Sequence, residues 1–278
     1  TSTVTAEGAS SFIAKENVTI AGTITATAGT TTITADSDGN DGTGTLEFDL
    51  ITATGQTVNL TANVATLGNQ EAITANTLNL TLTAEAGGAE NTLDLGGTKQ
   101  GDAGQLNIPD ANLVDMVIAG TFKIATTGNA SDIFVDGLSD TNTANIGTIH
   151  LDSSNDVILG DAASIVNGNL ILDALDDVLI GQNLTTTTGN INVISNEGNT
   201  NTTGEEITVA ANVVITAGLT DASNALLTLD SRGGHATNIT TFAGAGTLIA
   251  DEGITLTGGT QLGGLLTLDS DVDGDGVG

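Results

Sequence analysis

Two stretches near the middle of the chain decide the fold: Gly147–Gly160 reads GTIHLDSSNDVILG, and Gly168–Gly181 reads GNLILDALDDVLIG. A shift of 21 residues superimposes them, so that glycine meets glycine at both ends and Asp152 meets Asp173. Between these positions, most aliphatic residues meet aliphatic residues. A fixed period of this length is typical of solenoids, in which a short repeat cannot bury its apolar face alone and neighbouring repeats stack to cover it.

The period extends toward the end of the chain. A third copy opens 21 residues further on, at Gly189–Val193, and an insertion over 196–204 interrupts it before the pattern resumes at Ile207. The hexapeptide LLTLDS then occurs twice, at Leu226–Ser231 and again 39 residues later at Leu265–Ser270. Coils of about 19 to 21 residues account for these distances.

Each repeat alternates apolar and polar residues over short runs that lie between Gly, Asn, Asp or Thr. This alternation predicts short strands, and strands from successive coils would stack in parallel about 4.8 Å apart. The chain length then corresponds to about 13 or 14 coils and a rod of about 65 Å. Two inward ladders are predicted, one of Ile149, Leu170 and Ile191, the other of Leu151, Leu172 and Val193.

An antiparallel sandwich is the competing interpretation of many short strands. A sandwich predicts no fixed period with aligned glycines and aspartates, whereas this chain shows one. Helical spacing of apolar residues is not sustained over any useful length. We therefore predict an all-β chain folded as a parallel β-solenoid.

The sequence indicates one continuous domain over 1–278, because no linker-like stretch divides it. Regular coils are expected over 146–278, with the insertion at 196–204, and irregular coils over 1–145. In the irregular half, Gly101–Gly120 holds the only Pro and the only Met of the chain. We interpret this segment as an excursion or a change of coil shape.

Composition and charge exclude several classes of protein. The chain is 38% hydrophobic but has five Phe and neither Trp nor Tyr, which predicts a thin aliphatic core. Its formal charge of −30 repels phosphate backbones and anionic lipid, so we expect neither nucleic-acid binding nor membrane-surface binding. No apolar run approaches the roughly 18 residues of a membrane span, and the lack of Cys removes disulfides.

Units such as GNLILDALDDVLIGQNLTTTTGNINVIS, which begins at Gly168, resemble the β-helical repeats of filamentous haemagglutinin-type exoproteins and related giant surface adhesins. The resemblance covers 145–278 well and the first half of the chain loosely. It implies a right-handed parallel β-helix at the cell surface that serves adhesion, biofilm or filament architecture.

Acidic turns near both ends of the chain are candidate calcium sites. The pattern D-x-D-x-D-G places oxygen ligands at alternate positions, with a glycine for the turn, as in the first half of a calcium loop. It occurs at Asp269, Asp271, Asp273 and Asp275, and a looser version occurs at Asp36, Asp38, Asn40 and Asp41. The alternative is a solvated acidic turn, which Asp, Asn and Gly favour in any case.

Other charged residues are expected to be structural or solvated. The stacked pairs Asp152/Asp173 and Asp156/Asp177 would place like charges one strand apart, and we expect them to splay into water. His150 lies between two inward aliphatic residues and should point outward. With only one further histidine and no cysteine, neither a zinc site nor a nucleophilic triad is expected.

The sequence therefore predicts a non-catalytic extracellular structural protein, a building block of a cell-surface fibre, matrix or surface layer. An adhesin passenger region that binds surface glycans or other cells is the first alternative. A polysaccharide-active β-helix enzyme is the second, although sugar-binding enzymes usually carry the aromatic platforms that this chain lacks. We also expect the rod to associate head to tail or to continue into a longer chain, because neither end shows a recognisable cap.

Overall fold

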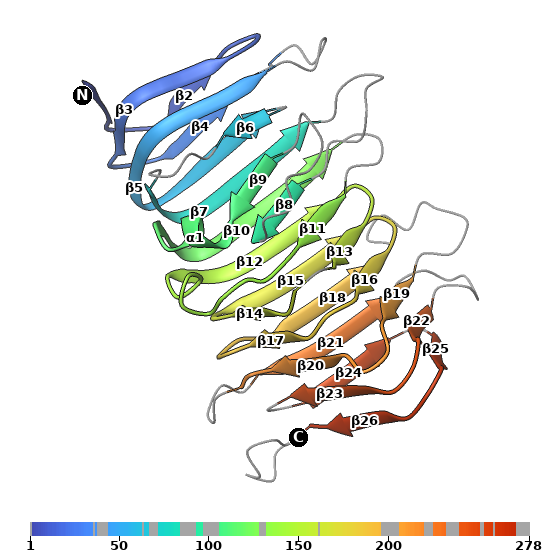
Figure 1. The fold of residues 1–278 in the computed structure, drawn as a ribbon. Helices are drawn as coiled ribbons and strands as arrows, with labels where there is room; N and C mark the ends of the chain where they lie inside the picture. Colours follow the sequence, from blue (N-terminus) through green and yellow to red (C-terminus); the bar gives the residue numbers. More distant parts are fainter. Residues whose placement is uncertain are drawn as a thin grey trace.

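The computed structural model describes residues 2–35, 37, 44–62, 64–66, 72–83, 93–96, 106–127, 132–160, 162–195, 206–219, 225–231, 239–250, 253–257 and 259–270. These residues form strands β1 to β26 and one four-residue helix, α1 (Asp110–Leu113). The strand pairs within the described ranges are parallel. The predicted all-β, parallel architecture is confirmed at this level, and Figure 1 shows it as an elongated stack.

From β12 onward, consecutive strands join three sheets in a constant order, and every third strand returns to the same sheet. The first sheet receives β12 (Ile146–Ser153), β15 (Asn169–Ala174), β18 (Ile191–Ser195), β21 (Leu226–Ser231) and β24 (Gly253–Thr257). The second receives β13 (Val157–Leu159), β16 (Val178–Ile180), β19 (Ile207–Val209), β22 (Ile239–Phe242) and β25 (Gly259–Leu262). The third is formed by β14 (Ser164–Val166), β17 (Leu184–Thr186), β20 (Val214–Ala217), β23 (Gly246–Ala250) and β26 (Leu266–Asp269).

The earlier strands are distributed differently. The first sheet contains β1 (Ser2–Ala6), β2 (Ser10–Ile13), β3 (Val18–Ala26), β4 (Thr30–Thr34), β5 (Thr45–Ala62), β6 (Val64–Thr66), β7 (Ala72–Thr83) and β10 (Met116–Thr127). The second contains β8 (Leu93–Gly96), β9 (Leu106–Pro109) and β11 (Ile133–Val135). The long strand β5 pairs with β3 along its first part and with β4 along its last part. It therefore spans the positions of two shorter strands. The described part of the segment around the single proline holds β9, α1 and the start of β10.

The predicted inward ladders are confirmed. Ile149 pairs in register with Leu170, which pairs with Ile191, and the second ladder through Leu172 follows the same register two residues on. All six side chains are fully buried. Each such side chain stabilises the fold by roughly 1.5–3 kcal/mol through removal of its apolar surface from water. The core is therefore a column of aliphatic residues that runs along the stack.

The repeated glycines have a steric cause. A Cβ atom on Gly168 would lie 2.2 Å from the carbonyl oxygen of Gly147, and one on Gly147 would lie 2.5 Å from the carbonyl oxygen of Ala119. Side chains do not fit at such distances, so glycine allows successive coils to approach closely at this corner. No helix in the described part of the chain has the length and apolar character needed to cross a membrane.

Leu172→Asp tests the core directly. The substitution buries a carboxylate in the middle of an aliphatic column and should destabilise the fold by roughly several kcal/mol. Ile165→Asp is the matched control, because Ile165 lies on β14 with 39% of its surface exposed. Chemical denaturation measures both free energies of unfolding. Equal losses in the two variants would contradict the inward ladder.

Candidate functional site

The calcium sites predicted from the sequence lie almost entirely outside the described residues. Of the terminal group, Asp269 ends β26 and its side chain is exposed, whereas Asp271, Asp273 and Asp275 are not among the described residues. Asp36, Asp38, Asn40 and Asp41 also lie outside them. The calcium assignment of both acidic turns stays a prediction.

A different group of acids stands out in the structure. Where the chain turns from the first sheet into the second, one acidic residue directly precedes the second-sheet strand in four successive coils. Asp132 precedes β11, Asp156 precedes β13, Asp177 precedes β16 and Glu206 precedes β19. We call these four residues the acid ladder.

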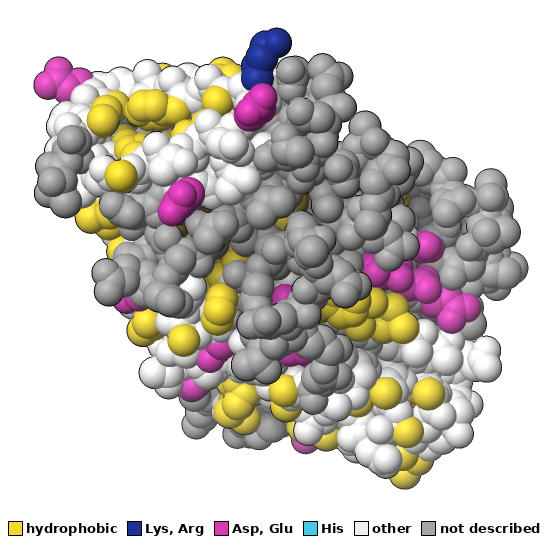
Figure 2. Space-filling model, turned by 45° about the horizontal axis from the view of Figure 1, so that its top comes forward, with side chains coloured by type: hydrophobic (Ala, Val, Ile, Leu, Met, Phe, Trp, Pro, Cys, Tyr) yellow, Lys and Arg dark blue, Asp and Glu magenta, His cyan; other side chains and the backbone are white. Residues whose placement is uncertain are grey.

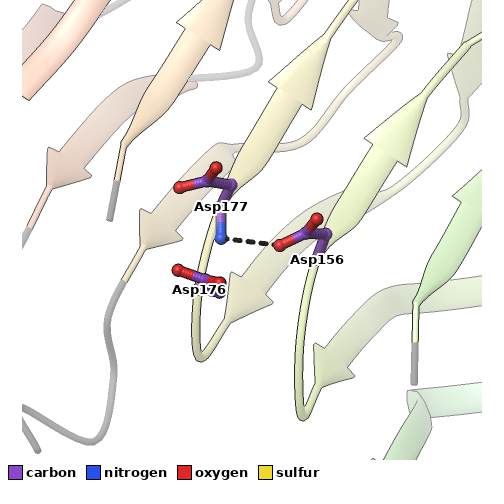
Figure 3. Close-up of side chains that lie close together, drawn as sticks. All are labelled: Asp156, Asp176 and Asp177. Atoms are coloured by element: carbon purple, nitrogen blue, oxygen red, sulfur yellow. Dashed lines mark hydrogen bonds between the residues drawn. The ribbon is translucent and has the colours of Figure 1, made fainter. Parts of the chain in front are cut away.

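Three carboxylates of the acid ladder, those of Asp132, Asp156 and Asp177, bind the backbone of the next coil. Asp132 Oδ1 accepts a hydrogen bond from the N–H of Asp156 at 3.2 Å. Asp156 Oδ1 accepts one from the N–H of Asp177 at 3.0 Å, and Figure 3 draws this second bond. Asp177 Oδ1 accepts one from the N–H of Glu206 at 2.8 Å. Each carboxylate thus supplies a partner to a backbone donor at a turn, where the strand ladder is interrupted.

The expectation that Asp156 and Asp177 splay into water is wrong, because the carboxylate of each bonds to the backbone of the next coil. One oxygen from each of Asp156, Asp176 and Asp177 also lies within 4.8 Å of the others. Parallel stacking in register holds these like charges together because it places equivalent residues of successive coils above one another.

Burial and neighbouring charges raise the pKa of Asp156 from 3.8 to about 6. Removal of the carboxyl group from water is the largest cause, and the nearby carboxylates of Asp132, Asp177 and Asp176 add to it. The hydrogen bond from the N–H of Asp177 acts in the opposite direction, since it stabilises the ionised form. Asp156 therefore accepts a proton at a higher pH than a carboxyl group in water does.

The chemical capability of this cluster follows from its donors. Carboxylate oxygens can hold a proton between them or bind a hard divalent cation such as calcium. Asp132, Asp156 and Asp177 also have a structural role, because their hydrogen bonds to the next coil connect successive coils. The sequence aligns Asp156 with Asp177, but residue insertions hide Asp132 and Glu206 from a fixed period. One sequence pattern could have identified all four residues: an acidic residue directly before a branched aliphatic residue that begins a three-residue strand.

A second charged group lies on the outer face of the first sheet. Lys123 of β10 forms an ion pair with Asp152 of β12, and His150 Nε2 lies 3.7 Å from Asp173 Oδ2 of β15. His150 alternates outward as predicted, but only 21% of its side chain is exposed. The expectation that Asp152 and Asp173 splay into water is wrong, since Asp152 is paired and the Asp173 side chain is 5% exposed.

No family model matches the chain, and no curated protein or solved structure matches it significantly. The resemblance to filamentous haemagglutinin-type exoproteins therefore rests on the repeat pattern alone.

Asp156→Asn should make the protein more stable at neutral pH. A raised pKa in the folded state means that Asp156 contributes stability below pH 3.8, and this contribution is lost as the pH rises through about 6. The asparagine keeps an oxygen for the N–H of Asp177 but carries no charge. We expect the variant to unfold at a higher temperature than the wild type at pH 8, with the difference closing toward pH 4.

Asp115→Asn is the matched control, because Asp115 is exposed and its replacement removes the same charge. Thermal melts of the three proteins across pH 4–8 provide the comparison. If the control gains as much as Asp156→Asn at pH 8, the effect comes from net charge and the local explanation fails.

Proposed function

We propose that this chain is a non-catalytic, extracellular β-solenoid of the right-handed parallel β-helix type, and that it is a building block of a cell-surface fibre, matrix or surface layer. The constant order in which the chain joins three parallel sheets supports the solenoid. The strong preference of parallel crossover connections for the right hand supports the right-handed form. The acid ladder supports a structural role, because three of its four carboxylates bond to the backbone of neighbouring coils.

The assembly part of the proposal rests on one observation: side chains in line with the core are exposed on the last described coil. Leu268 pairs in register with Leu248, yet Leu268 is 54% exposed and Leu248 is fully buried. In the same way, Leu262 is 52% exposed beside Phe242, which is 1% exposed. These side chains occupy the same ladders as core residues, and another coil stacked on this end would bury them.

The amino-terminal end shows the same feature. Val4 of β1 is 44% exposed, whereas Ile24, its partner in register on β3, is fully buried. Figure 2 shows hydrophobic side chains gathered on this end of the stack. Both ends thus combine open apolar positions with outer strands whose second edge has no partner among the described strands. Such edges favour pairing with another strand of the same direction.

We infer that further coils cover these ends, either those of a second copy joined end to end or those of a longer chain to which these coils belong. The stack is polar, so the last coil of one copy meets the first coil of the next with all strands running in one direction. The net charge of −30 opposes this contact. Salt and divalent cations screen such repulsion, and the association should therefore strengthen with either.

Leu268→Asp should weaken end-to-end association, since it places a charge at an open core position of the last coil. Leu219→Asp is the matched control, because Leu219 is 60% exposed, lies between β20 and β21 away from the outermost coils, and receives the same charge. Sedimentation velocity at high ionic strength, together with electron microscopy, measures the assemblies.

The wild type and Leu219→Asp should form chains that lengthen with protein concentration, and Leu268→Asp should remain monomeric. Wild-type protein that stays monomeric at high concentration, in calcium and in high salt, would contradict the assembly proposal. Equal loss in both variants would assign the effect to added charge rather than to the end of the stack.

The calcium prediction has a separate test. If Asp269, Asp271, Asp273 and Asp275 bind calcium, titration calorimetry should detect a site that Asp271→Ala and Asp273→Ala weaken. Asp156→Asn controls for calcium held by the acid ladder and should leave this site intact. Calcium that raises the melting temperature of all these variants equally would contradict the assignment to the terminal acidic turn.

A further inference from the structure

Four charged or titratable residues meet on three neighbouring strands of the first sheet, on its outer face. The register places Lys123 of β10 beside His150 of β12, and Asp152 of β12 beside Asp173 of β15. The contacts run diagonally, from Lys123 to Asp152 and from His150 to Asp173. This group is separate from the acid ladder, which lies at the turns that lead into the second sheet.

Asp173 is the unusual member of the group. Its side chain is 5% exposed, and its Oδ1 atom is buried with no hydrogen-bond partner among the described residues. A buried carboxylate without donors or a positive partner is strongly unfavourable, because it loses its hydration and regains nothing. A positive charge beside Asp173 would therefore stabilise its ionised form.

Lys123 does not supply that charge, because its ion pair with Asp152 engages it. His150 faces Asp173 instead, with Nε2 at 3.7 Å from Oδ2. This distance is too long for a hydrogen bond. Nε2 is itself buried and has no hydrogen-bond partner within the described ranges. The imidazole nitrogen of His150 and the carboxylate of Asp173 thus face each other, and each group has a buried atom without a hydrogen-bond partner among the described residues.

We propose that His150 Nε2 and the carboxylate of Asp173 bind a divalent transition-metal ion of the zinc class. Bonds of about 2.0–2.2 Å to nitrogen and oxygen place two ligands of a tetrahedral ion about 3.4 Å apart, close to the separation present here. The ion supplies the positive charge that Asp173 lacks and occupies the lone pair of the imidazole. Water completes the coordination, and Asp152, in register with Asp173, is the nearest further carboxylate along the strand pair.

The imidazole makes the site selective. Calcium and magnesium prefer oxygen ligands, and the acid ladder offers only those, whereas an imidazole nitrogen favours zinc, nickel or copper. A metal ion at this site also connects adjacent coils, because His150 belongs to β12 and Asp173 to β15. Binding to the folded state alone raises the melting temperature by mass action. Low pH competes with the metal, since the ligands must be deprotonated.

The chain has only two histidines, His150 and His235, which allows a clean test. Titration calorimetry with Zn²⁺ in excess Mg²⁺ follows binding while magnesium occupies carboxylate-only sites. We expect one zinc per chain in the wild type and in His235→Gln, and at least tenfold weaker binding in His150→Gln and in Asp173→Asn. The imidazole NMR signals of the wild-type protein should show zinc acting on His150 and leaving His235 unchanged.

Two results overturn the proposal. Wild-type zinc affinity in His150→Gln would mean that carboxylates alone hold the metal. A His150 signal that titrates with pH but does not respond to zinc would mean that the pair is only an imidazolium–carboxylate contact. Circular dichroism checks that each variant is folded, and if Asp173→Asn is not, the NMR measurement on the wild-type protein decides the question.

Discussion

Parallel pairing of each coil with the next, in register, is the constraint on which the rest of the structure depends. Strands of three to six residues cannot hold a fold alone, and the regular half of this chain is built largely from such strands. Stacking at strand spacing puts equivalent side chains above one another, which turns single aliphatic residues into continuous buried ladders. The close approach of the coils in turn demands glycine at positions such as Gly147 and Gly168.

The same stacking creates a problem for polar residues, since like groups also come to lie on like groups. Side-chain amides can satisfy one another within their own ladder, as where Asn79 Nδ2 donates to Asn59 Oδ1. Carboxylates cannot donate to one another once ionised. In the acid ladder the backbone N–H groups of the next coil provide the donors.

The solution is incomplete at Asp156, where burial and three neighbouring acids leave a raised pKa. At Asp173 no donor within the described ranges reaches the buried Oδ1 atom, and the facing imidazole lies beyond hydrogen-bond distance. At both of these positions negative charge is left to neutralise, by a proton at the first and, as we propose, by a metal ion at the second. Both carboxylates are held by the register of the strands rather than by any local motif.

The sequence by itself determined the strand type, the parallel stacking and the inward ladders, because a 21-residue period with aliphatic residues at matching positions has few other physical outcomes. It also aligned Asp156 with Asp177. It did not reveal that Asp132 and Glu206 continue that ladder, since insertions change the spacing while the turn geometry stays the same. Nor did it show that the outward residues His150 and Asp173 are shielded from water. Only the tertiary structure decided that, because alternation along a strand tells which face a side chain takes, whereas its exposure and its partners depend on residues from other coils.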